Sequence, residues 1–243
     1  MPLGVAGIVL PRLAATTLAI GLVIWSANQL VEGRHTATIR FLAEAIEAGK
    51  LPRQDVLDRL HDDESPARIM ASCDVPNLRA LAVVRLRELD LAVELADGDR
   101  ADRAYEAAEA ALYRALRCAP LDGNLWLRLA VVDAARGGPA TMTIEFIKLS
   151  YWTAPSEAST VRERVGFASR LLESGVTEVQ PELRSDIRTL VNHDSARNVA
   201  DMYVAAPKSA LPIYREWIAL LPQEHRQSLA RAVERRGGNL NGT

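Results

Sequence analysis

Four histidines and two cysteines are the residue types most able to hold a metal, and they are scattered along the chain. No pair of histidines has the His-Glu-x-x-His spacing that places two imidazoles on one helix face. The two cysteines lie far apart and form no Cys-x-x-Cys motif. The sequence therefore predicts no metal site and no cofactor. These residues are His35, His61, His193, His225, Cys73 and Cys118.

The run His61-Asp62-Asp63-Glu64 concentrates groups that can bind a cation. A calcium site needs about 6–8 oxygen ligands that converge from a fixed frame. A short polar run next to Pro66 is more typical of a solvated loop between helices. We interpret it as such a loop.

The tripeptide His193-Asp194-Ser195 contains the three residue types of a hydrolase triad. Consecutive residues cannot face one another as a triad requires. Asp194 or Ser195 instead fits the N-cap of a helix over residues 196–205. We predict no catalytic residue, and no glycine-rich phosphate loop follows a strand.

The charge balance gives no electrostatic case for binding nucleic acid or an anionic membrane surface. The 243-residue chain has a formal net charge of -2, and Arg12 is the one charged side chain before residue 32. A nearly neutral domain has no electrostatic footprint for nucleic acid. No small-molecule substrate is evident either.

Residues 13–31 contain no charged side chain over 19 positions. A helix of this length rises about 28 Å, close to the thickness of a bilayer core. Arg12 precedes it, so the positive-inside rule predicts a cytoplasmic N-terminus. We expect a single-pass anchor in the inner (cytoplasmic) membrane, with the bulk of the chain in the periplasm.

Two alternatives to the anchor remain open. A cleaved signal peptide would release a secreted or periplasmic protein, but cleavage after Ala27 would put the bulky Trp25 where a small residue is needed. The other alternative is a buried core helix of a soluble protein. The cysteines also leave two readings: a Cys73–Cys118 bridge in an oxidising compartment, or two small buried thiols.

The remaining chain has helical periodicity almost throughout and no convincing strand, so we predict an all-α fold. Helices are expected over residues 36–49, 77–95, 102–118, 125–135, 141–152 and 156–173, with about four shorter ones beyond Pro181. The predicted organisation is an anchor (1–31), short helices with a linker (32–76), paired helices (77–175), C-terminal helices (176–236) and a frayed tail (237–243).

A spacing of 35 residues separates Ala119-Pro120 from Ala154-Pro155, and each pair ends one helix just before another begins. Small and large residues before and after Pro120 occur at the positions expected for such helix pairs, over about residues 89–172. They are Leu95, Ala96, Ala108, Leu112, Ala115, Trp126, Leu129, Ala130 and Phe146. This pattern resembles the tetratricopeptide-repeat family, whose unit is a helix pair of about 34 residues. It departs from the family where a tyrosine is expected, at Asp99 or Asp133.

The resemblance implies a solenoid of stacked helix pairs that binds protein partners on the face made by first helices. Here those positions are Asp90, Val93, Asn124, Leu127 and Val131. The expected function is a membrane-anchored, non-catalytic interaction module or scaffold, as part of a polysaccharide or secretion assembly of the cell envelope. The alternatives are an enzyme acting on envelope glycans, or a structural subunit of a larger membrane complex.

Overall fold

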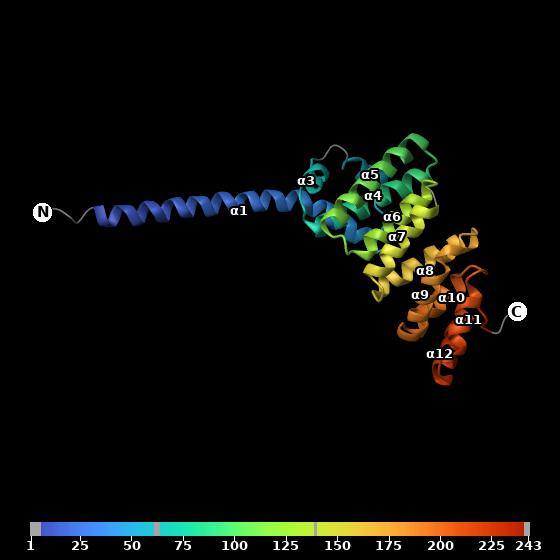
Figure 1. Ribbon diagram of the computed structural model, residues 1–243. Coiled ribbons are helices and arrows are strands. Elements are labelled where there is room, and N and C mark those ends of the chain that lie inside the picture. Colours follow the sequence, from blue (N-terminus) through green and yellow to red (C-terminus); the bar gives the residue numbers. More distant parts are fainter. Residues whose placement is uncertain (1–5, 61–63, 139, 241–243) are drawn as a thin grey trace. The chain divides into compact units, whose positions relative to one another are not determined.

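The computed structural model describes residues 6–60, 64–138 and 140–240, with side chains from residue 18 onward except 27–35. Every regular element in these ranges is a helix, which confirms the all-α prediction (Figure 1). The chain forms two compact units, residues 1–104 and 105–243, here called unit 1 and unit 2.

Unit 1 is built on two long helices that pack against each other. The two long helices are α1 (Ala6–Glu47) and α4 (Val75–Glu94). Unit 1 also contains α2 (Gln54–Asp58), α3 (Ser65–Ala71) and the start of α5 (Gly98–Cys118). The C-terminal part of α1 buries Ile39, Leu42 and Ala43, and α4 buries an apolar stripe that includes Leu78 and Leu81. Burying such stripes is what holds short helices in place, because isolated helices are only marginally stable in water.

Capping residues set the helix ends of unit 1. Asp74 accepts a hydrogen bond from the Asn77 amide and so begins α4. Gly49, two residues after the end of α1, has a positive φ of 75°, which confirms the predicted stop there. Asp97 accepts a hydrogen bond from the Arg100 amide, so α5 starts at Gly98, four residues earlier than the periodicity indicated.

The helix α1 is continuous, whereas the sequence suggested a separate helix after residue 36. Figure 1 shows its N-terminal part extending away from the other helices of unit 1. All side chains of residues 18–26 are exposed, including Leu22, Ile24 and Trp25. No helix among the residues that the structure describes is long and apolar enough to cross a membrane. The predicted span, 13–31, lies partly outside the residues whose side chains are described.

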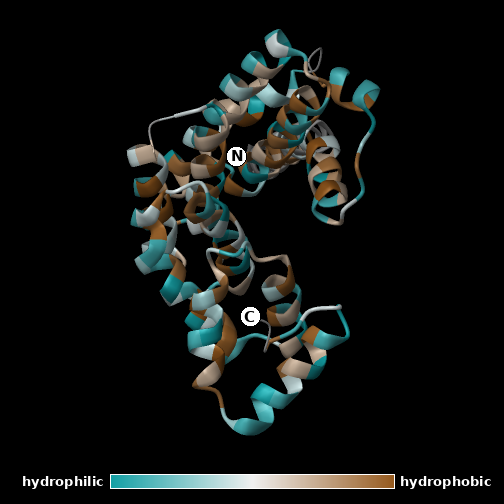
Figure 2. Cartoon of the chain, turned by 90° about the vertical axis from the view of Figure 1, so that its right-hand side faces the viewer, coloured by the Kyte–Doolittle hydropathy of each residue, from teal (hydrophilic) through white to brown (hydrophobic). Residues whose placement is uncertain are grey.

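Unit 2 continues as a series of shorter helices. They are the rest of α5, then α6 (Gly123–Ala135), α7 (Ala140–Thr153), α8 (Ala158–Glu173), the 3-10 turn η1 (Thr177–Val179), α9 (Gln180–His193), α10 (Ala196–Ala205), α11 (Leu211–Ala219) and α12 (Gln223–Glu234). The four helices α9 to α12 match the number expected beyond Pro181. Hydrophobic and hydrophilic residues alternate along these helices (Figure 2).

Each helix of unit 2 from α6 to α12 packs on a helix one or two places away in the chain. The helix α6 packs on α7 and α8, α8 packs on α9, α9 contacts α11, and α10 contacts α12. Gly123, the first residue of α6, lies against the end of α7. A Cβ atom there would overlap the Ala154 side chain and lie 2.9 Å from the Ser150 carbonyl oxygen. Only glycine allows α6 to begin so close to the end of α7.

Both cysteines, Cys73 and Cys118, are disulfide-bonded. This finding decides between the two readings that the sequence left open. The interpretation as two buried thiols is wrong.

Candidate functional site

Two of the five predicted partner-binding residues lie in unit 1, on α4. Val93 is 53% exposed, and Asp90 is exposed one turn earlier. The Arg87 guanidinium lies 3.9 Å from the Asp90 carboxylate. Partial burial raises the pKa of Asp90, although the charge of Arg87 opposes the rise. Both side chains are available at the surface of unit 1.

The other three residues lie on α6 in unit 2. Asn124 is partly exposed and Val131, two turns later, is 38% exposed. Leu127 is only 2% exposed. It is a core residue, which corrects the sequence-based assignment, because a helix with more than one packed neighbour buries a wider stripe than the repeat pattern implied.

Asn124 is the centre of a polar network that joins α6 to α8. Its side-chain amide donates to the Glu163 carboxylate at 3.1 Å, and its carbonyl oxygen accepts from Arg128 Nε at 2.5 Å. Val131 continues the exposed side of α6 beyond Arg128. We call these four residues, Asn124, Arg128, Val131 and Glu163, the α6–α8 face.

The start of α6 is held by Asp122. Its carboxylate accepts hydrogen bonds from the backbone amides of Asn124 and Leu125, at 3.1 and 3.2 Å. Such an N-cap satisfies amides that have no partner within the helix. The cap therefore fixes the first turn, from which Asn124 reaches Glu163.

A buried ionic cluster holds α8 against its neighbours. Arg164 has no exposed surface, and it donates from Nε and Nη2 to the two carboxylate oxygens of Asp186 at 2.6 and 2.8 Å. Its Nη1 donates to Ser150 Oγ at 3.0 Å, and both terminal nitrogens approach the Ala154 carbonyl oxygen at 3.3–3.4 Å. The five N–H groups of the guanidinium are thus all satisfied.

The same cluster includes Tyr151. The Arg164 guanidinium lies over the Tyr151 ring at 5.4 Å, and the Tyr151 hydroxyl hydrogen-bonds to Ser185 at 2.9 Å. Burial raises the pKa of Asp186, and the hydrogen bonds and charge of Arg164 oppose that rise. The cluster therefore ties together α7, α8 and α9.

Adjacent residues on a helix point about 100° apart. Fixing Arg164 in the core therefore fixes the direction in which Glu163 leaves α8. The buried cluster thus positions one half of the α6–α8 face.

The residues singled out as a nominal triad have structural roles. Ser195 is the N-cap of α10 and accepts from the Asn198 amide at 3.2 Å, as predicted. Asp194 accepts from Arg162, from Asn198 and from the Ser195 amide. Although partial burial raises the pKa of Asp194, these hydrogen bonds from Arg162, Asn198 and Ser195 lower it below its usual value.

No group of three or more potential metal ligands occurs in the part of the chain that the structure describes. Residues 61–63 lie outside the described residues, so the interpretation of His61-Asp62-Asp63-Glu64 as a solvated loop stays a prediction.

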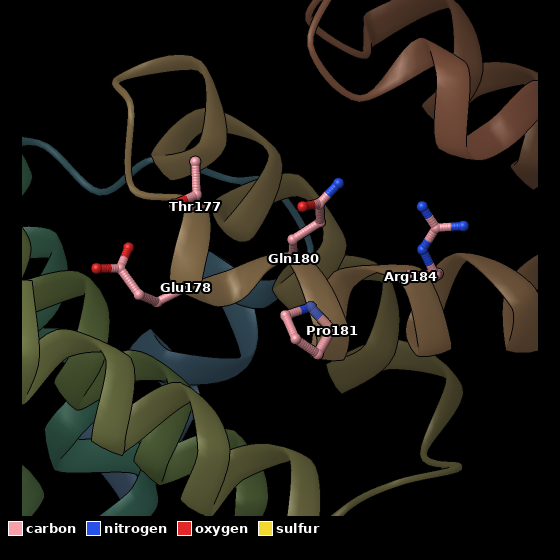
Figure 3. Close-up of a pocket in the computed structure, with 5 residues that line it drawn as sticks. All are labelled: Thr177, Glu178, Gln180, Pro181 and Arg184. Atoms are coloured by element: carbon pink, nitrogen blue, oxygen red, sulfur yellow. The ribbon is translucent and has the colours of Figure 1, made fainter.

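A shallow hollow of about 440 Å³ lies at η1 and the start of α9, lined by Thr177, Glu178, Gln180, Pro181 and Arg184. Figure 3 shows that Glu178 and Arg184 point in different directions from it. Arg184 is moreover paired with Glu216. Ligand sites need polar groups that converge on one point, so we assign this hollow no ligand.

Comparisons with protein-family models, curated proteins and solved structures returned no match. Assignment of a function therefore depends on the geometry. The sequence pointed to Asn124 and Val131 but not to Glu163, Arg164 or Asp186. Arg164 and Asp186 are 22 residues apart on different helices, and no motif connects them.

Proposed function

We propose that this protein is a membrane-anchored, non-catalytic helical-repeat scaffold whose α6–α8 face binds a protein partner in the periplasm, within a cell-envelope assembly. The composition of the α6–α8 face is the observation that supports a binding role. This face presents an amide, a guanidinium, a carboxylate and an exposed valine from two adjacent helices, over a buried cluster that keeps them in place. Recognition surfaces commonly combine an apolar contact with fixed polar groups.

The packing around this face supports the tetratricopeptide-like reading. Ala108, Leu112, Ala115, Leu129 and Ala130 are all buried. The Trp126 and Phe146 rings stack at 5.9 Å, so the large residues of α6 and α7 meet as a helix pair requires. Leu95 departs from the pattern, since it is 54% exposed and follows the last residue of α4.

Two observations support an anchor and an oxidising compartment. Residues 18–26 expose apolar side chains on all sides of α1, and water is a poor environment for such a surface. The neighbouring residues 13–17 and 27–31 carry no charge in the sequence. The disulfide-bonded state of Cys73 and Cys118 is typical of proteins outside the cytoplasm.

The binding role is tested by capturing partners from solubilised membranes with the full-length protein as bait. Val131→Asp should reduce the recovery of specific partners about tenfold, because a charge then replaces an apolar contact (about 1.4 kcal/mol). Leu220→Asp is the matched control, since Leu220 is 70% exposed in the same unit but lies outside the α6–α8 face. Equal recovery with the two variants would refute the proposal.

The anchor is tested separately by carbonate extraction. The wild-type protein should remain in the membrane pellet, and Ile20→Arg with Ile24→Arg should shift it to the supernatant, since each arginine near the centre of a span costs about 2.5–3.5 kcal/mol. Phe41→Arg, at an exposed position of α1 beyond the predicted span, should leave the protein in the pellet. Wild-type protein in the supernatant would contradict the anchor.

A further inference from the structure

The helices α11 and α12 diverge and leave a hollow between them. They are joined by the short turn at residues 220–222, but α11 packs on α9 while α12 packs on α10. The hollow has a volume of about 250 Å³. Its lining residues are Arg215, Ile218, Ala219, Arg226, Ala230 and Leu240.

The lining has an apolar part and a cationic part. Ile218, Ala219, Ala230 and Leu240 supply the apolar surface, and two arginines supply the charge. Arg226 donates from Nη1 to the Ala219 carbonyl oxygen at 3.5 Å, which holds its guanidinium beside the end of α11. Arg215 Nε lies 3.4 Å from the Tyr203 hydroxyl.

The surrounding segment is also positively charged. Residues 211–240 contain five arginines and three glutamates; Glu216 is paired with Arg184 and Arg236 with Asp201, which leaves four arginines and two glutamates. An anion that enters the hollow would therefore meet a favourable potential. The five arginines are Arg215, Arg226, Arg231, Arg235 and Arg236, and the glutamates are Glu216, Glu224 and Glu234.

The volume limits what can bind. Pockets for drug-sized ligands usually span about 300–1,000 Å³, so this hollow lies below that range. Long acyl chains and oligosaccharides are too large, and a bare inorganic anion would leave the apolar surface uncovered. One amino-acid residue with an apolar side chain and a carboxylate satisfies both parts.

We propose that the hollow between α11 and α12 binds the C-terminal residue of a partner polypeptide. The free α-carboxylate pairs with Arg226, with Arg215 adding positive charge, and the apolar side chain covers Ile218 and Ala230. A planar guanidinium suits a carboxylate because it can donate two parallel hydrogen bonds. This site uses other helices than the α6–α8 face, and it stands whether or not that face binds a partner.

The test is isothermal titration of the full-length protein in a non-ionic detergent with acetyl-Ala-Leu, as the free acid and as the C-terminal amide. The acid should bind at least about tenfold more tightly than the amide, since the amide lacks the charge-assisted hydrogen bonds. Equal affinity of the two peptides, or no binding of the acid at millimolar concentration, would overturn the proposal.

Variants locate the binding. Arg226→Gln should lower the affinity for the free-acid peptide at least about fivefold. Arg231 is exposed on α12 and does not line the hollow, so Arg231→Gln should leave this affinity unchanged. Ala230→Glu should also abolish binding, because it fills the hollow and repels the carboxylate. If the two arginine variants bind the free-acid peptide with equal affinity, or if hexanoate binds and the peptide does not, a polypeptide C-terminus is not the ligand.

Discussion

Two groups of buried charges differ in how completely they are paired. In unit 2 Arg164 contacts residues of α7 and α9 as well as the α7–α8 turn, and all its N–H groups have acceptors. In unit 1 the buried charges of α4 pair along the same helix: Arg85 with Glu88 at 2.7 Å, and Arg87 with Glu94 at 3.1 Å. Arg87 Nε and one carboxylate oxygen of Glu88 have no hydrogen-bond partner among the described residues.

The difference shows what each group does for the fold. A charge pair that joins several helices favours one arrangement of those helices, and it loses that role if either partner is removed. Pairs within one helix stabilise that helix but do not select its neighbours. We therefore expect the Arg164 cluster to favour one packing of α7, α8 and α9, whereas the packing of α4 should depend on its apolar stripe.

The largest expected effect comes from breaking the Arg164 cluster. Arg164→Ala leaves Asp186 and Ser150 buried without their partner, so the free energy of unfolding should fall by about 3–5 kcal/mol. Urea unfolding followed by circular dichroism measures the change. The double variant Arg164→Met with Asp186→Leu should recover most of the loss, because it leaves no buried charge. If Arg164→Ala is as stable as the wild type, the buried charges of unit 2 do not differ from those of α4 in their effect on the fold.

A smaller effect is expected at the crossing that the cluster supports. Gly123→Ala places a methyl group against Ala154 and the Ser150 carbonyl, so it should destabilise unit 2 by about 1–3 kcal/mol. Gly166→Ala in α8 is the matched control. Its Cβ would meet only the Arg170 side chain at 3.8 Å, and it should stabilise the helix by up to about 1 kcal/mol. The same unfolding measurement compares the two, and equal effects would argue against a tight crossing.

Replacing the Arg85–Glu88 pair of α4 by apolar residues should not lower the free energy of unfolding, in contrast to the loss expected for Arg164→Ala. Arg85→Met with Glu88→Leu removes a largely buried pair that has an unsatisfied oxygen. We expect a stability equal to the wild type or higher by about 1 kcal/mol, because burying charges costs more than an incomplete set of hydrogen bonds returns. A large decrease in the stability of this double variant, measured by thermal unfolding, would show that the Arg85–Glu88 pair also specifies packing.

The smallest effect concerns the partly exposed pair Arg162–Asp194, at 2.9 Å. The pKa of Asp194 is lower in the folded protein than its usual value of 3.8. The carboxylate therefore stabilises the fold fully above about pH 3.8, and this stabilisation is lost as the pH falls through the folded-state pKa. Asp194→Asn should remove about 0.5–1 kcal/mol at pH 7 and less at pH 3. The exposed Asp102→Asn serves as the control in unfolding at the two pH values. If Asp194→Asn lowers the free energy of unfolding equally at pH 7 and pH 3, the ion pair with Arg162 is not the source of the stabilisation.

The sequence predicted the helices well and the contacts between them poorly. Helical periodicity and the stops at Gly49, Pro120 and Gly137 are local signals, and the observed helices follow them. Leu127 was misplaced because its burial depends on neighbouring helices. The Arg164–Asp186 pair could not be anticipated, since only the folding of α8 onto α9 brings these residues together.

The continuity of α1 has a mechanical consequence. The helix runs unbroken from Ala6 to Glu47, and its first described buried residue is Ile39. If the proposed span ends at residue 31, about 12 Å of rigid helix separates the bilayer from the body of unit 1. A helix transmits torque and bends little over such a length. Unit 1 would then stand at a set height above the lipid, and a rotation of the anchor would turn the unit with it.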